Sequence, residues 1–69
     1  MPRHPLGPSW VLAAVSELTD SQPRGARLPA ERALAARLGV GRAVVRHALR
    51  ELEYTGKIRT HAQSGSYVR

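Results

Sequence analysis

Two helices joined by a tight turn are encoded by residues 30–56, which read AERALAARLGVGRAVVRHALRELEYTG. In both halves apolar residues recur at the three- and four-residue spacing of one helix face. They are Ala33, Leu34 and Leu38 in the first half, and Val45, Ala48, Leu49 and Leu52 in the second. Gly39 and Gly56 follow these faces, and glycine ends helices because it readily adopts left-handed backbone angles. The pattern predicts helices at residues 30–38 and 42–55, arranged as a helix-turn-helix.

The sequence on either side predicts one further helix and a hairpin. Ser9 can cap a helix through its hydroxyl. Apolar residues at helical spacing follow it up to Leu18, so we expect a helix at residues 9–19. Residues 26–28 should be extended because Pro29 disfavours helix at the residue before it. Residues 57–60 and 66–68 are typical of two strands around a turn at residues 62–65.

The predicted fold class is mainly α with a small β-hairpin (α+β), a winged helix-turn-helix of three helices and a wing at residues 57–68. It occupies residues 9–69, after a flexible N-terminal arm at residues 1–8. We expect a shallow core made of Trp10, Leu18, Leu34, Leu38, Val45, Leu49, Leu52, Ile58 and Val68. A domain of this size should have a free energy of unfolding near the bottom of the usual range of roughly 5–15 kcal/mol.

The composition favours a polyanionic partner and excludes several other classes of protein. The 69 residues carry a formal net charge of +6, and nearly all of the excess lies after residue 20. A small, asymmetric basic domain is typical of proteins that bind nucleic acid. The chain has no cysteine, its three histidines lack metal-ligand spacing, and we find no catalytic pair of carboxylates and no nucleophile beside a base. No apolar segment approaches the roughly 20 residues that span a bilayer. We therefore expect no enzyme, no cofactor, no metal and no membrane partner.

Three arginines of the second helix in the motif form a basic face. Arg42, Arg46 and Arg50 are spaced four apart and stack on the side away from the apolar residues. One alternative is a plain solvated face, softened by Glu51 and Glu53. The second helix of a helix-turn-helix enters the major groove of DNA, however, where arginine can donate two hydrogen bonds to guanine. We therefore expect Arg42 and Arg46 to contact bases, whereas phosphate contact and solvation stay equally open for Arg50.

A family pattern runs through the same stretch. Its residues are Leu28-Pro29-Ala30-Glu31-Arg32, Leu34-Ala35, Leu38-Gly39-Val40, Arg42, Val45-Arg46 and Ala48-Leu49. This series resembles, without a gap, the pattern L-P-S-E-R-x-L-A-x-x-L-G-V-S-R-x-T-V-R-x-A-L of the DNA-binding domain of GntR-family bacterial transcription regulators. Leu52 and Gly56 continue the match, and Ser66-Tyr67-Val68 resembles the T-F-V that closes the family's wing. The resemblance covers about residues 10–68 and implies a winged helix-turn-helix.

The resemblance also implies a role for each matching residue. Arg32, near the start of the helix expected at residues 30–38, would contact the DNA backbone or an adjacent base, and the tip of the wing would approach the minor groove. The residues expected at the DNA are Arg32, Arg42, Ala43, Val44, Arg46, Arg50, Gln63, Ser64 and Gly65. The alternative for Arg32 is an ion pair with a nearby carboxylate such as Glu31 or Glu51.

Several departures from the family pattern should weaken the DNA contacts. Ala30 replaces the usual Ser or Thr at an expected helix N-cap, which costs about 0.5–2 kcal/mol. Gly41 replaces a Ser and lacks a hydroxyl that could bond a phosphate. Val44 replaces a Thr and can touch a thymine methyl but cannot hydrogen-bond a phosphate. Gln63 and Ser64 replace a wing glycine and a residue that is often basic. We expect weaker binding than in a typical relative, or a compensating partner.

Together these observations predict a sequence-specific binder of double-stranded DNA, a bacterial transcription regulator domain that is cytoplasmic and nucleoid-associated. One copy would contact one half-site, so an inverted-repeat operator and a homodimer on DNA are expected. A small-molecule effector enters only if a C-terminal domain exists outside this chain, and the chain could be an excised domain or a solo winged helix. The main alternative is a winged-helix protein-interaction module without specific DNA binding, with Ala43, Val44 and Tyr54 as contacts. Binding of structured RNA is a further alternative.

Overall fold

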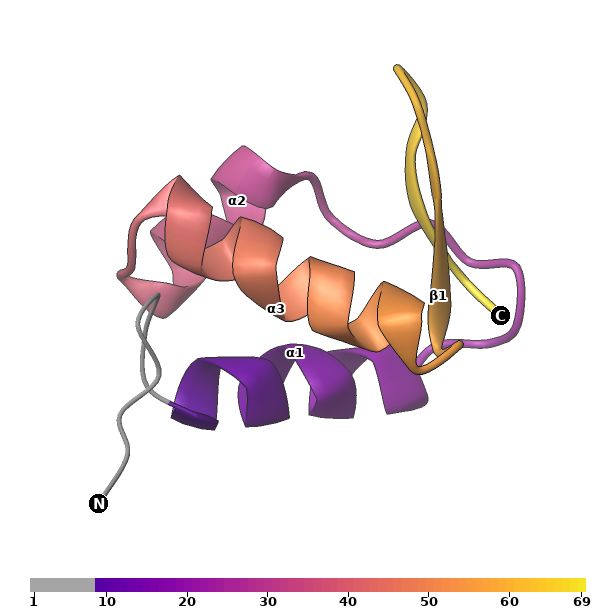
Figure 1. The fold of residues 1–69 in the computed structure, drawn as a ribbon, viewed down its shortest axis with the longest axis horizontal. Helices are drawn as coiled ribbons and strands as arrows, with labels where there is room; N and C mark the ends of the chain where they lie inside the picture. The colour runs from indigo at the N-terminus through magenta and orange to yellow at the C-terminus, as the bar shows by residue number, and fades with distance from the viewer. Residues whose placement is uncertain (1–8) are drawn as a thin grey trace.

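The computed structural model describes residues 9–69, so the predicted arm at residues 1–8 lies outside the described residues. Its elements are α1 (Ser9–Asp20), α2 (Glu31–Leu38), α3 (Arg42–Tyr54), β1 (Ile58–His61) and β2 (Gly65–Val68). α1 lies along α3, α2 packs near the beginning of α3, and the hairpin stands at the other end of α3 (Figure 1). The predicted winged helix-turn-helix is confirmed. Within the described part of the chain, no helix combines the length and the apolar character that a membrane span requires.

Backbone angles at single residues set the ends of α2 and α3. Ala30 is the N-cap of α2, with extended angles of φ −63° and ψ 157°, so this helix begins one residue later than predicted. Gly39 ends α2 with a left-handed φ of 71°, as expected of a C-terminal glycine. Gly41 is the N-cap of α3, and α3 ends at Tyr54, one residue before its predicted end. The short connection between Gly39 and Gly41 therefore turns the chain from one helix into the next.

The core lies between α1, α3 and the wing, and a smaller cluster joins α2 to α3. The main cluster contains Val11, Val15, Leu28, Ala48, Leu52 and Ile58, and the second contains Leu34, Ala35 and Val45. Four other predicted core residues are partly buried against these clusters, namely Leu18, Leu38, Leu49 and Val68.

Two positions expected on buried faces are wrong. Trp10 is 49% exposed, because α1 turns the row of Val11 and Val15 toward α3 and residue 10 lies about 100° away around the helix. Ala33 is also exposed, since α2 buries the next two residues instead. Helical spacing identified the right helices, but on α1 and α2 the predicted buried stripe was rotated slightly around the helix axis.

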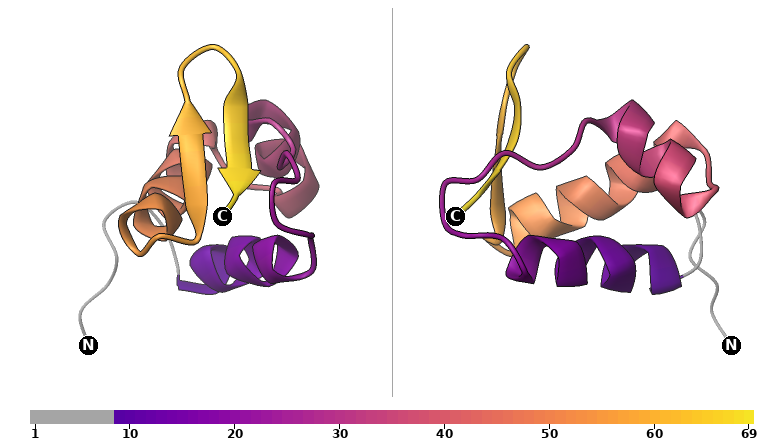
Figure 2. Two further views of the ribbon diagram at one scale, coloured as in Figure 1. Left: turned by 90° about the vertical axis from the view of Figure 1, so that its right-hand side faces the viewer. Right: turned by 180° about the vertical axis from the view of Figure 1, so that it is seen from behind.

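The wing is an antiparallel hairpin whose register runs from Ile58 opposite Val68 to His61 opposite Gly65. Gly65 was expected in the turn but belongs to β2, so the turn comprises residues 62–64. The predicted extended segment before Pro29 runs beside β2 (Figure 2), and its Arg27 forms an antiparallel bridge with Tyr67. The extended segment therefore lies beside the hairpin, along the free edge of β2.

A polar contact joins the base of the wing to α1. The Lys57 ammonium donates hydrogen bonds to the Asp20 carboxylate at 2.8 and 2.9 Å and to the Ser16 hydroxyl at 3.0 Å. Because the Asp20 side chain is mostly exposed, this pair adds little to the free energy of unfolding. It orients the chain where β1 leaves α3.

Candidate nucleic-acid interface

α3 carries five of the nine residues that we expect at the DNA, and four of these five lie on its exposed side. Arg42, Ala43, Arg46 and Arg50 are exposed, on the side away from the core. Val44 differs, because it is half-buried and packs against the main core cluster. Only part of its side chain is therefore free to meet a base.

A carboxylate from α2 joins two of these arginines. Glu31, the first residue of α2, accepts hydrogen bonds from Arg46 Nε at 2.9 Å and from Arg46 Nη2 at 3.0 Å. It also accepts one from Arg42 Nε at 3.0 Å. The two bonds from Arg46 form a fork that fixes the plane of its guanidinium group. Both Nη atoms of Arg46 keep outward N–H groups, which can still donate to a guanine.

These contacts keep the carboxylate and the guanidinium charged. Hydrogen bonds from Arg46 hold the pKa of Glu31 below its ordinary value; desolvation of the carboxylate opposes this shift, and Arg42 adds to it. The hydrogen bonds to Glu31 in turn raise the pKa of Arg46. The side chains of Arg42 and Arg46 are 54% and 50% exposed, so a ligand can reach both. Repulsion between the two arginines is reduced by this carboxylate from α2. The alternative of a solvated face had assigned that effect to Glu51 and Glu53.

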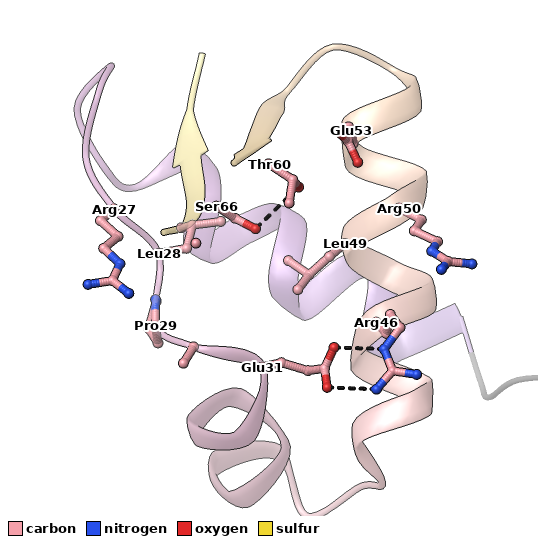
Figure 3. A pocket seen from close by; sticks show the side chains of 12 residues that line it. Arg27, Leu28, Pro29, Glu31, Arg46, Leu49, Arg50, Glu53, Thr60 and Ser66 are labelled. Carbon is pink, nitrogen blue, oxygen red and sulfur yellow. Dashed lines mark hydrogen bonds and ion pairs between the residues drawn. The ribbon is translucent and has the colours of Figure 1, made fainter. Parts of the chain in front are cut away.

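A groove of about 340 Å³ lies between α3, the segment that enters α2 and the wing (Figure 3). Its lining comprises Arg27, Leu28, Pro29, Ala30 and Glu31 on one side, Arg46, Leu49, Arg50 and Glu53 from α3, and Thr60, Gly65 and Ser66 from the wing. The hydroxyls of Thr60 and Ser66 lie 3.4 Å apart across the two strands. Arginines therefore stand on both sides of a groove that has apolar residues and hydroxyls between them.

The remaining expected contact residues lie outside this groove. Arg32 is exposed on α2 and makes no ion pair within residues 9–69, so Glu31 binds Arg42 and Arg46 instead of its neighbour. Gln63 and Ser64 are exposed at the tip of the wing, where the Ser64 hydroxyl lies 2.6 Å from that of Tyr67. Their approach to a minor groove stays a prediction. No group of three or more His, Cys, Asp or Glu in the described residues could hold a metal ion.

Two residues of the groove were missed by reasoning from the sequence. Glu31 appeared in the family pattern and as a possible partner of Arg32, whereas its actual partners lie 11 and 15 residues further along the chain. Arg27 was counted toward the net charge, but no local spacing connects it with the wing. The only local signal was an arginine directly before the extended Leu28-Pro29 pair. This signal does not indicate that β2 lies beside Arg27.

Comparison with protein families decides what kind of protein this fold represents. The family model described as "Bacterial regulatory proteins, gntR family" matches residues 18–68, most of the chain. The chain belongs to the gntR family. This gntR domain is accordingly a winged-helix DNA-binding domain of the transcription-regulator type, and the predicted resemblance is confirmed.

Solved structures agree with this assignment. GntR from Streptococcus agalactiae is 32% identical with a TM-score of 0.79, over 87% of this chain and 30% of that one. PhnF from Mycobacterium smegmatis is 34% identical with a TM-score of 0.74, over 84% of this chain and 25% of that one. The NTD of AraR in complex with mutant ORR3 shares the fold, with a TM-score of 0.83 at 22% identity and coverage of 88% and 90%.

The chain thus spans about a third or less of the length of GntR and PhnF. Among curated proteins, none matches it significantly. None of the comparisons supports the alternative of a protein-interaction module that has lost DNA binding.

Proposed function

We propose that this gntR domain recognises a guanine-containing half-site in the major groove of duplex DNA through α3, while the wing lies at the adjacent minor groove. The observation that carries the proposal is the contact of Glu31 with two exposed arginines on the second helix of the motif. It orients their guanidinium groups and leaves their outer N–H groups available. Each bidentate arginine–guanine contact is worth about 1–3 kcal/mol of discrimination between bases.

The proposed contact residues follow from this placement. Arg42 and Arg46 contact base edges, with Ala43 and the exposed part of Val44 beside them. Arg32 and Arg50 contact phosphates, and the tip of the wing follows the backbone toward the minor groove. The wing residues in question are Gln63, Ser64 and Gly65.

Residues 9–69 then act as one DNA-binding unit that contacts one half-site. Two copies on an inverted repeat, forming a homodimer on DNA, would double the contacts and match the symmetry of the operator. This chain spans 30% of GntR and 25% of PhnF. A small-molecule effector would take part only if a domain outside this chain exists to bind it. The protein would work at the nucleoid in the bacterial cytoplasm.

In vitro selection from random duplex DNA tests the base contacts directly. We expect the wild type to enrich a half-site, and Arg46→Ala to relax the preference at one base pair and to cost about 1–3 kcal/mol. Arg37→Ala is the matched control, because Arg37 is exposed on α2 but does not line the groove. If Arg46→Ala weakened binding to all sequences equally, its contact with a base would be wrong. No enrichment by a folded wild-type domain would contradict specific DNA binding itself.

The salt dependence of binding tests the phosphate contacts. The logarithm of the affinity should fall with the logarithm of the salt concentration, with a slope of about −0.9 for each neutralised phosphate. Fluorescence anisotropy with a labelled duplex measures this slope. An affinity that does not change with salt would contradict DNA binding through the basic face.

A further inference from the structure

The segment before α2 is hydrogen-bonded to β2 along the edge of the two-stranded wing. The N–H groups of Gly25 and Leu28 donate to the carbonyls of Val68 and Ser66, both at 2.8 Å, and the N–H of Val68 donates to the Ala26 carbonyl at 2.9 Å. Residue 27 lies between the residues that form these hydrogen bonds. Its backbone position is therefore set by the wing, although the segment belongs to the connection between α1 and α2.

The side chain of Arg27 lies across the backbone of Gly65. A Cβ atom added at Gly65 would come within 2.9 Å of Arg27 Nε and 3.3 Å of Nη2, which is too close for ordinary packing. Gly65 also has a φ of 123°, in the region that favours glycine. The absence of a side chain at residue 65 therefore lets the guanidinium group of Arg27 rest against the wing.

Nothing in the described structure neutralises this guanidinium group. Within residues 9–69 Arg27 makes no ion pair. Two carboxylates line the same groove: Glu31 is bound to Arg42 and Arg46, and Glu53 forms no ion pair with Arg27. Arg27 is exposed and lies on the side of the groove opposite Arg50 (Figure 3). Folding alone gives no reason to hold an unpaired arginine here, whereas a polyanion in the groove would.

We propose that Arg27 binds a backbone phosphate of the DNA strand that passes the wing, from the side of the groove opposite α3, and that Gly65 positions it there. This inference rests on the proposed function, because it places the same duplex against the same groove. Arg27 would hold one edge of the duplex while Arg46 and Arg50 approach from the other. Since a phosphate contact carries no information about sequence, Arg27 contributes to affinity and orientation and not to base preference.

Substitution of Arg27 separates this role from its alternatives. We expect Arg27→Ala to weaken binding to the selected duplex and to a scrambled one equally, by roughly fivefold at 0.15 M salt, and to reduce the salt slope by about 0.9. Arg27→Lys should retain most of the affinity and the slope, because lysine binds phosphate as a point charge. The matched control is Arg24→Ala, which removes the same charge from the same segment but outside the groove. Circular dichroism melting checks that every variant is folded.

Neutral phosphates identify the contact itself. One methylphosphonate at a single backbone position should weaken binding of the wild type and leave binding of Arg27→Ala unchanged, because that variant has already lost the contact. Equal losses for Arg24→Ala and Arg27→Ala would overturn the proposal and indicate a net-charge effect only. A methylphosphonate scan with no position specific to Arg27 would overturn it as well. A failure of Arg46→Ala to change base preference would instead contradict the proposed function and leave the result for Arg27 intact.

Discussion

Ala30 and Gly41 leave the first backbone N–H groups of α2 and α3 without a side-chain acceptor, since neither cap forms a side-chain hydrogen bond. Both residues nevertheless have the extended backbone angles of an N-cap. A hydroxyl at either position would therefore meet a free N–H two or three residues further on without any rearrangement of the chain. The departures from the family pattern at these two N-caps therefore lower the free energy of unfolding, because a capping hydrogen bond is missing at each.

Ala30→Ser should raise the free energy of unfolding by about 1 kcal/mol, the typical value of an N-cap hydroxyl. Gly41→Ser should raise it by only a few tenths of a kcal/mol, because glycine is already a tolerable cap. The Cβ of that serine would have open space around it. Urea denaturation measures both changes. Ala36→Ser, an exposed position inside α2, should give no gain; an equal gain there would contradict the assignment of the cap.

Gln63 is the non-glycine residue of the described chain that has a positive φ, at 70°. An L-residue in this left-handed region costs roughly 1–2 kcal/mol. Glycine avoids this cost but loses more chain entropy on folding, which costs roughly 0.5–1 kcal/mol. We expect Gln63→Gly to raise the free energy of unfolding by about 0.5–1 kcal/mol. Thermal melting of Gln63→Gly and of Ala62→Gly, where φ is not positive, would test this. A gain shared by both variants would argue against strain at residue 63.

At the scale of the elements, α2 orients the arginine side chains on the exposed face of α3. Glu31 begins α2, and its carboxylate is 22% exposed between two arginines of α3. The packing of α2 against α3 therefore determines how the guanidinium groups of these two arginines are oriented. Without this contact the same arginines would be long, freely rotating cations.

Glu31→Gln should change affinity and specificity in opposite directions. We expect tighter binding to a scrambled duplex, because the positive charge of the face increases. We also expect about 1 kcal/mol less discrimination for the selected site, the lower end of what a bidentate arginine contributes. Competition binding measures both quantities. Glu53→Gln is the control, because Glu53 lines the groove without an ion pair in the described structure. Unchanged discrimination in Glu31→Gln would contradict a positioning role.

The same pair predicts a pH dependence of stability. The pKa of Glu31 is lowered in the folded protein by hydrogen bonds from Arg46. Its contribution is therefore present above the pKa of the unfolded chain and is lost as the pH falls through the lower, folded-state pKa. The difference in Tm between the wild type and Glu31→Gln should shrink between about pH 5 and pH 3. A difference that stays constant over this range would contradict the shift.

At the scale of the whole molecule, stability depends on the contact of α1 with α3 and the wing. Val11 and Val15 are each 1% exposed, and Ile58 at the beginning of the wing is 0% exposed. One small cluster thus connects α1, α3 and β1. The orientation of the wing relative to α3 depends on this cluster.

Val11→Ala should lower the free energy of unfolding by about 2–3 kcal/mol, from lost burial and the cavity left behind. In a domain of this size that lowers Tm by roughly 10–20 °C. Trp10→Ala should cost less than about 1 kcal/mol, because the side chain is half-exposed. Differential scanning calorimetry of the two variants provides the comparison. A larger loss for Trp10 than for Val11 would contradict the orientation of α1.

Local pattern was sufficient to predict the elements of this protein. The spacing of apolar residues identified three helices, Gly39 and Gly56 indicated where two of them end, and the extended segment before Pro29 was recognised from a steric rule. The basic side of α3 follows from the same periodicity, because residues four apart must share a face. The errors were rotations of a buried stripe, as with Trp10, and shifts of one residue at helix ends.

The amino-acid sequence by itself determined the helix-turn-helix, the wing and the basic face, because each is indicated by neighbours within one or two helical turns. The family follows from the longer ungapped pattern at residues 28–56. Only the tertiary structure decided that Glu31 holds Arg42 and Arg46, and that Arg27 rests on Gly65. These contacts join elements that are separated along the chain and whose positions in space are set by packing angles and strand pairing. Backbone periodicity reports which face a side chain occupies, whereas the partner opposite that face depends on how whole elements pack.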